Sequence, residues 1–126
     1  MKSKWSRSWV RSLQPRKQRK YVFNAPAHIL KKLMSAPLTK ELQKQYGKRN
    51  ISVRVGDTVK ITTGQFKGTI GKIDKVNMNK QRVYVAGAEQ VKSNGQLAQY
   101  PIHPSNITII TPKLDDKKRK GALNRK

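Results

Sequence analysis

The stretch Val55–Ile73, VGDTVKITTGQFKGTIGKI, decides the fold because its four glycines interrupt a regular alternation of apolar and polar residues. Val59 and Ile61 alternate with polar neighbours, and this period of two indicates a β-strand with one buried face. Gly64 and Gly68 fall where the chain has to reverse, and glycine adopts the positive φ of tight turns without steric cost. The stretch therefore predicts two strands joined by a glycine turn.

The tip of this turn, Phe66 and Lys67, is a candidate contact for a phosphate backbone. A turn of this kind can lay backbone N–H groups, one cation and one ring against a ribose-phosphate chain. For Phe66, a ring offered to RNA and a ring folded back onto the core are equally open. For Lys67 we favour a contact with phosphate.

The same period of two recurs from Ile51 onward. Ile70, Ile73 and Val76 continue it with one break at Gly71, which predicts a bulge or a bend. Val53 and Val55 alternate with polar neighbours, and Val83 and Val85 alternate again.

Turn residues separate these strands at regular intervals. NMNKQ (77–81) is a turn, and Asn94-Gly95 between two short polar strands is a strong two-residue hairpin pattern. NITIIT (106–111) is the final strand before a proline. Five or six short strands at this spacing predict a mainly β fold, a small closed or half-closed barrel.

Two short helices are predicted ahead of the strands, over 26–34 (PAHILKKLM) and 38–47 (LTKELQKQYG). Pro26 suits a first turn, Thr39 can cap the second helix and Gly47 can end it. The expected apolar faces consist of Ile29, Leu30, Leu33 and Met34 in the first helix and Leu38, Leu42 and Tyr46 in the second.

The charge of the chain points to a polyanionic partner. The formal net charge is +23 over 126 residues, with 29 Lys and Arg against 6 Asp and Glu. Such self-repulsion opposes compactness unless a polyanion neutralises it, and nucleic acid supplies regularly spaced phosphates. Residues 1–40 contain 11 basic residues and no acidic one, and residues 113–126 contain 7 basic and 2 acidic residues. The layout is a basic arm, a modest core and a basic tail.

Residues 1–20 are too polar to bury an apolar surface of their own. Trp5, Trp9 and Leu13 recur at intervals of four and would share one helical face. Four interpretations remain open: an organelle transit peptide, a membrane-surface helix that stops before Pro15, a tail without a role, and an arm that orders against RNA with its indoles on bases or sugars. We favour the last.

Catalytic and metal chemistry is not expected. The chain has no cysteine and no apolar run near the ~20 residues that span a bilayer, and its N-terminus lacks the apolar segment of a secretory signal. These features predict a soluble, intracellular protein without cofactor, metal or membrane insertion. His28 and His103 lack plausible metal partners, Asp115 and Asp116 belong to a solvated or self-paired tail, and GTIGK (68–72) departs from a P-loop in spacing and context.

A family resemblance appears at these motifs. Residues 53–87 resemble a KOW motif, with G-D-x-V-x-I followed by G-x-x-K-G-x-x-G-x-I. The flanks 15–47 and 100–110, with the phrases MSAPL and IHPSN, resemble the archaeal and eukaryotic branch of a large-subunit ribosomal protein family. This family is number twenty-four in universal naming and twenty-six in eukaryotes. The resemblance covers about residues 14–120, and Trp5 and Trp9 match no pattern of the family.

The resemblance implies an SH3-like barrel that binds large-subunit rRNA near the peptide-tunnel exit and contributes to subunit assembly in the cytoplasmic ribosome. Implied partners are the early part of the large rRNA, neighbouring ribosomal proteins and factors that dock at the tunnel exit. The expected organisation is a basic arm (1–24), two short helices (25–49), the barrel (50–112) and a basic tail (113–126).

Carried over by position, the resemblance implies RNA contacts in three places: Arg16, Lys17, Arg19 and Lys20 in the arm, Lys67 and Gly68 at the tip, and His103, Pro104, Ser105 and Asn106 in the second family phrase. For that phrase a turn held by local Ser and Asn hydrogen bonds is equally open. Lys31 and Lys32 lie opposite the apolar face of their helix, where an RNA-facing role and a solvated surface are also equally open.

A structural rRNA-binding protein is the favoured function. A KOW-type transcription elongation factor is the first alternative, but such factors usually pair the barrel with another folded domain. A DNA-packaging protein shares the charge without needing a barrel with a glycine tip. A cationic membrane-active protein is the remaining class.

Overall fold

The structure is a computed structural model, and it describes residues 5–6 and 12–125. Its centre is a five-stranded antiparallel sheet in the order β6-β5-β4-β3-β7. These strands are β3 (Thr58–Ile61), β4 (Ile70–Asn77), β5 (Arg82–Val91), β6 (Leu97–Ile102) and β7 (Ile107–Thr111). A separate antiparallel pair joins β1 (Ser35–Pro37) to β2 (Asn50–Ser52). The prediction of a mainly β protein is confirmed.

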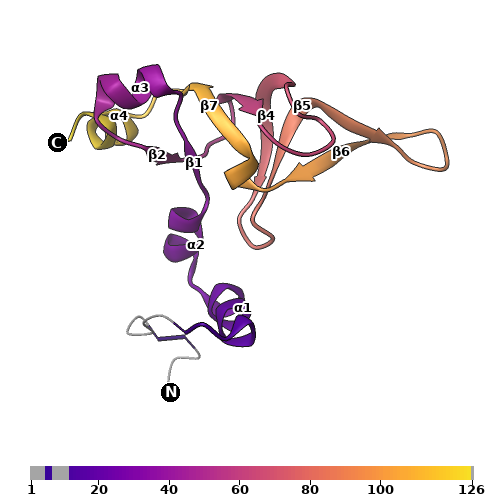
Figure 1. Ribbon diagram of the computed structural model, residues 1–126, viewed down its shortest axis with the longest axis horizontal. Helices are drawn as coiled ribbons and strands as arrows, with labels where there is room; N and C mark the ends of the chain where they lie inside the picture. Colours follow the sequence, from indigo (N-terminus) through magenta and orange to yellow (C-terminus); the bar gives the residue numbers. More distant parts are fainter. Residues whose placement is uncertain (1–4, 7–11, 126) are drawn as a thin grey trace.

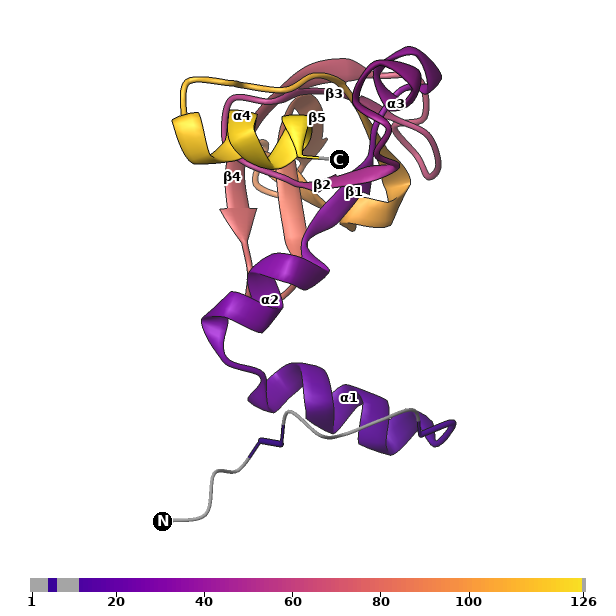
Figure 2. The same cartoon turned by 90° about the vertical axis from the view of Figure 1, so that its left-hand side faces the viewer.

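Four α-helices and one 3₁₀ turn surround the strands in the described part of the chain. They are α1 (Pro15–Asn24), α2 (Ala27–Leu33), α3 (Lys40–Tyr46), α4 (Lys117–Asn124) and the 3₁₀ turn η1 (Pro104–Asn106). Figure 1 shows α1 and α2 reaching away from the strands, while α3 and α4 lie at the same end of the domain as the β1–β2 pair. Figure 2 shows the same arrangement from the side, with α2 between the strands and α1.

The core follows the predicted alternation. Val59 and Ile61 of β3, Ile73 of β4, and Val83 and Val85 of β5 are all buried. Burying such a side chain stabilises the fold by roughly 1.5–3 kcal/mol. Residues from outside the sheet complete the same cluster, among them Met34, Ala36, Leu38 and Leu123.

Of two exposed apolar residues that the sequence predicts in strands, Val55 lies outside any strand and Ile70 lies within one. Val55 is 53% exposed, because β2 ends at Ser52 and the chain turns at 55–56 before β3 begins. Ile70 begins β4 as predicted, but it is exposed, because it lies three residues before the buried Ile73 and therefore on the opposite face of the strand.

The irregularity predicted at Gly71 lies further along β4, where the register against β5 shifts between Ile73 and Lys75. Gly71 has a different role. A Cβ there would lie 2.2 Å from the carbonyl oxygen of Ala86, so glycine is needed for the close approach of β5.

The two predicted helices are present as α2 and α3. Pro26 occupies the N-cap position of α2, and Gly47 ends α3 in the left-handed conformation with φ +64°. Thr39 is the N-cap of α3, but its side chain makes no capping hydrogen bond. The apolar face of α2 is narrower than expected, because Leu30 is buried whereas Leu33 is exposed.

The arm contains a helix that the sequence pattern does not predict. Pro15, expected to stop a helix, is instead the first residue of α1, a position where its missing N–H costs nothing. None of the residues of α1 is buried. Of the residues expected on one helical face, Trp9 lies outside the described residues, Leu13 is exposed and non-helical, and the Trp5 ring packs 5.2 Å from that of Tyr21.

The basic tail is also ordered, as α4, and it docks on the core through Leu123 and Arg119. Among the helices that the structure describes, none combines the length and apolar character needed to cross a bilayer.

Candidate nucleic-acid interface

The β3–β4 turn is held by its own backbone. Gly64 and Gly68 have φ of +98° and +90°, which confirms the need for glycine in this turn. The Lys67 N–H donates to the Gly64 carbonyl at 3.2 Å, and the Gly68 N–H donates to the Ile61 carbonyl at 2.8 Å. Lys67 and Gly68 are both exposed at the tip. The tip therefore presents the side chain of Lys67 to solvent, whereas the backbone N–H groups of Lys67 and Gly68 are already bonded within the turn.

The loop between β6 and β7 is fixed by local hydrogen bonds, as the alternative interpretation of the phrase IHPSN requires. The Nδ1 atom of His103 accepts from the Ser105 N–H at 3.3 Å and lies 2.8 Å from the Ser105 Oγ. The Asn106 N–H donates to the His103 carbonyl at 2.9 Å. The Asn106 carbonyl in turn accepts from the N–H of Thr62 at 2.8 Å, which ties the loop to the end of β3. Pro104 is buried beneath the loop.

The turn and the loop are brought together, although about 40 residues separate them in sequence. They border a shallow hollow of about 190 Å³. The ring of Phe66 lies 5.2 Å from that of Tyr100, at an interplanar angle of 55°. Phe66 also packs against the core cluster. Of the two interpretations left open for Phe66, a ring folded back onto the core is therefore the one observed, although the ring still lines the hollow.

Two residues of this hollow, Arg82 and Tyr100, are absent from the sequence-predicted site. Arg82 begins β5, and its Nη1 donates to the carbonyl of Gln81 at 3.0 Å. Partial burial, and then the positive charge of Arg82, lower the pKa of His103 below its ordinary value of 6.5. His103 is consequently neutral near pH 7. Tyr100 begins the flank 100–110 on which the family resemblance rests, but nothing in the sequence places Arg82 beside that flank.

The basic residues of the arm lie apart from the hollow. Arg16, Lys17, Arg19 and Lys20 are exposed on α1, and Lys31 and Lys32 are exposed on α2. None of these six side chains makes an ion pair within the described residues. A second depression places α1, with Arg19 and Phe23, beside Asn79 and Gln81 of the β4–β5 turn, and it shares no lining residue with the hollow. The contact of the six cations with RNA stays a prediction.

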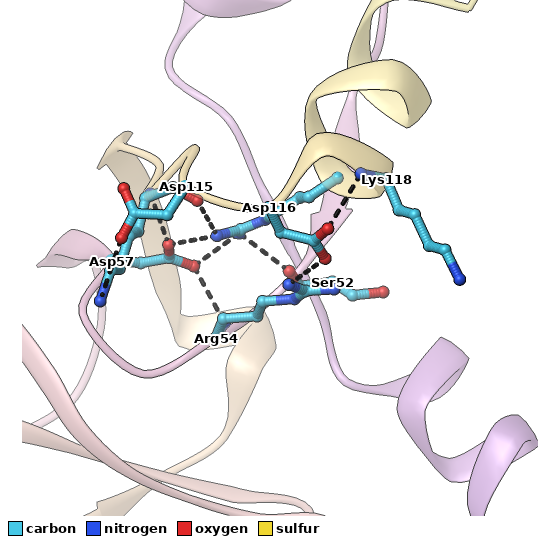
Figure 3. Close-up of polar contacts among 8 residues, drawn as sticks. Ser52, Arg54, Asp57, Asp115, Asp116 and Lys118 are labelled. Carbon is cyan, nitrogen blue, oxygen red and sulfur yellow. Dashed lines mark hydrogen bonds and ion pairs between the residues drawn. The ribbon is translucent and has the colours of Figure 1, made fainter.

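The C-terminal helix is locked onto the domain by a buried ion pair, and Figure 3 shows the polar contacts around its carboxylate, Asp57. Asp57 is 0% and Arg119 is 4% exposed. The two Nη atoms of Arg119 lie 2.6 and 2.7 Å from the two carboxylate oxygens of Asp57. The backbone N–H groups of Arg54 and Lys113 donate to the same carboxylate at 2.9 and 2.8 Å. Arg119 is thus removed from any RNA-binding surface.

The prediction for the tail carboxylates is correct for Asp115 and wrong for Asp116. Asp115 pairs with Lys113 at 3.3 Å within the tail, and both side chains are exposed. Asp116 instead pairs with Arg54 of the domain at 2.6 Å and accepts from the Lys118 N–H at 2.9 Å as the N-cap of α4 (Figure 3). The hydrogen bond from Arg54, followed by that from Lys118, lowers the pKa of Asp116 below 3.8. Nothing in the sequence indicated that Asp57 would have a buried cationic partner.

Across residues 5–6 and 12–125, no group of three or more His, Asp or Glu side chains is arranged to hold a metal ion. The side chains that the structure gathers are cations, hydrogen-bond donors and two aromatic rings. This set can neutralise phosphate and accept a planar ring.

Comparison with known proteins gives two findings. A family model described as the eukaryotic ribosomal proteins L26 and their archaeal L24 counterparts matches residues 12–126. The chain is also 48% identical, over 121 residues, to the large ribosomal subunit protein uL24 of Nanoarchaeum equitans. That alignment covers 96% of this chain and 81% of the relative. The resemblance stated from the sequence motifs is confirmed.

Proposed function

Because the chain belongs to the family of eukaryotic L26 and archaeal L24 ribosomal proteins, we propose that it is a structural component of the large subunit of the cytoplasmic ribosome and binds large-subunit rRNA. It acts by binding and not by catalysis. The observation that carries the proposal is the 48% identity to a large-subunit protein along nearly the whole chain. The net charge of +23 supports an RNA partner.

The barrel assignment is part of the proposal. The five-stranded antiparallel sheet, with a 3₁₀ turn between its last two strands, supports an SH3-like barrel over 50–112 that contains the KOW motif. In this barrel the glycine turn and the η1 loop lie side by side around one hollow. The fold thereby supplies a fixed surface to which two separated motifs contribute.

Two kinds of contact with the RNA have different roles in binding. The cations of α1, α2 and the tip neutralise phosphates and release counterions, so they supply affinity without reading sequence. The rigid turn and loop fix where the domain sits on the RNA, because shape and the positions of phosphates dominate recognition of double-stranded RNA. A position near the peptide-tunnel exit, a contribution to subunit assembly, and contacts with neighbouring ribosomal proteins and tunnel-exit factors follow from the family resemblance.

Reconstitution tests this function. The purified chain should bind large-subunit rRNA in preference to a random RNA duplex and to heparin at near-cellular ionic strength, and should co-sediment with the large subunit. Small-subunit rRNA is the matched control, since it offers the same phosphate charge in a different shape. Equal affinity for all four polyanions would reduce the interaction to charge alone and reject the proposal.

A further inference from the structure

The hollow between the β3–β4 turn and the η1 loop has an aromatic side. The rings of Phe66 and Tyr100, whose centroids are 5.2 Å apart, both line it and both are only partly buried. Each ring is anchored on one side by the core cluster. Rings held in this way can accept a further planar group at little entropic cost, since their own rotamers are already fixed.

The rim of the hollow is rich in hydrogen-bond donors. Arg82 has five N–H groups, and Nη1 is the atom that donates to the backbone of its own turn, to the Gln81 and Lys80 carbonyls. His103 accepts a backbone N–H at Nδ1, which places the proton of the neutral ring on Nε2 as a further donor. Asn106 contributes an amide. The residues that line the hollow include no Asp or Glu, so nothing there repels an anion.

The size of the hollow restricts its occupant. Its volume of about 190 Å³ is below the ~300–1,000 Å³ typical of sites for drug-sized ligands. It has room for one ring system, and its open side leaves a path for a chain to enter and leave.

We propose that this hollow binds a single unpaired nucleotide of the RNA, with its base against the ring of Tyr100 and its phosphate beside Arg82. The inference rests on the proposed function, and it requires that the rRNA segment facing the hollow has one nucleotide turned out of its helix. Unpaired bases are the part of RNA that proteins stack on aromatic side chains. A nucleotide within a polymer fits better than a free mononucleotide, because the hollow is too shallow to enclose a ligand by itself.

The first experiment maps the contact in the wild-type complex. Full-length protein bound to large-subunit rRNA is irradiated with ultraviolet light and digested with protease and nuclease, and the nucleotide adducts are located by mass spectrometry. The adduct is expected on Phe66 or Tyr100. An adduct confined to other residues, or none in this region, overturns the inference even where no variant can be prepared.

The second experiment separates stacking from charge. Tyr100→Leu keeps an apolar side chain against the core but removes the ring, and should weaken binding to the rRNA roughly tenfold with the salt dependence unchanged. Arg82→Gln should lower the salt slope by roughly 0.7–0.9, the value for one phosphate contact. The matched control is Tyr84→Leu, since Tyr84 is a half-buried tyrosine of β5 outside the hollow.

The outcomes are distinguishable. Wild-type protein without preference for large-subunit rRNA rejects the proposed function itself. If Tyr100→Leu and Arg82→Gln both keep the full wild-type preference for large-subunit rRNA, the nucleotide site is rejected and the proposed function stands. Saturable binding of AMP alone at micromolar concentration would show a mononucleotide site and overturn the assignment to the polymer. Thermal unfolding of each variant establishes that a loss of affinity is not a loss of folding.

Discussion

The helices α1 and α4 have nearly the same charge but opposite relations to the domain. Each contains four basic residues, at 16, 17, 19 and 20 in α1 and at 117–120 in α4. No residue of α1 is buried, whereas α4 buries Arg119 and Leu123. One helix offers its cations to solvent, and the other uses one of them to attach itself to the fold.

The difference comes from the acidic groups that each helix meets. Asp57 is placed by the turn before β3 to receive Arg119, and Asp116 caps the first turn of α4. The N-cap residue of α1, Gln14, makes no side-chain capping hydrogen bond, and α1 has no acidic residue in its first turn. The cations of a basic segment therefore stay available to a polyanion only where the fold itself supplies no counter-charge. Burial of one complementary carboxylate is enough to change its role.

The largest expected change in stability follows from removal of the Asp57 carboxylate, which holds α4 on the domain. Asp57→Asn leaves the guanidinium of Arg119 buried without a counter-charge, which should cost about 3–5 kcal/mol of unfolding free energy. Urea denaturation followed by circular dichroism measures it. Lys118→Gln, a change to an exposed cation of the same helix, is the matched control and should have little effect.

A double variant sharpens this test. Asp57→Asn combined with Arg119→Met should recover much of the stability lost in Asp57→Asn, because no unpaired charge remains buried. If Asp57→Asn cost no more than the control, the ion pair would not be what attaches α4.

The second prediction compares apolar residues of the two helices. Leu123→Ala removes a side chain that is 1% exposed, so it should cost about 2–4 kcal/mol. Phe23→Ala removes a larger side chain that is 88% exposed on α1, and should leave the unfolding free energy nearly unchanged. Equal losses in the two variants would mean that α1 packs on the domain and that the comparison is wrong.

Much of the fold was accessible from sequence because its elements depend on local patterns. The buried alternation at Val59, Ile61 and Ile73, the turn at Gly64, and the αL end of α3 at Gly47 each follow from spacing or from a conformation that favours glycine. The prediction of a strand position for Val55 failed, because this residue continues the alternation in sequence but lies beyond the end of β2, in a turn. Alternation alone does not locate the end of a strand.

The candidate site was predictable only in its exposed parts. The tip residues Lys67 and Gly68 follow from the turn, and they lie at its exposed end. The pairing of Asp57 with Arg119 joins residues 62 positions apart, so no local sequence pattern predicts it. The neighbourhood of Arg82 and His103 likewise depends on the path of the sheet. Charge density suggested one role for both ends of the chain, whereas the structure buries one cation of α4 and none of α1.

The third prediction concerns RNA affinity and charge. Replacing Arg16, Lys17, Arg19 and Lys20 together by Gln should flatten the salt dependence of rRNA binding by roughly 0.7–0.9 for each phosphate that these cations neutralise. The unfolding free energy should not change, since α1 buries nothing. Fluorescence anisotropy across a range of KCl concentrations measures the slope.

The matched variant in α4 replaces Lys117, Lys118 and Lys120, which are exposed, and leaves Arg119 in place. Its slope should change less, because this variant removes three cations and the α1 variant removes four. A larger change in α4 than in α1 would make the C-terminal helix the main RNA contact.

The smallest expected effect is a pH dependence of stability that arises from Asp116, the N-cap residue of α4. The folded pKa of Asp116 is lowered by its bonds to Arg54 and Lys118, so the unfolded chain takes up a proton at higher pH than the folded one. The stability that Asp116 contributes is therefore complete above its ordinary pKa of 3.8 and is lost as pH falls below that value. Asp116→Asn removes the charge but retains a capping side chain. Because the side chain of Asp116 is 37% exposed and its ion pair is screened by water, wild type should exceed this variant only slightly in stability at about pH 6, and the difference should vanish toward about pH 2. A difference that stays constant across that range would mean that the charge of Asp116 adds no stability, and α4 would then be held by Asp57 without help from the surface pair.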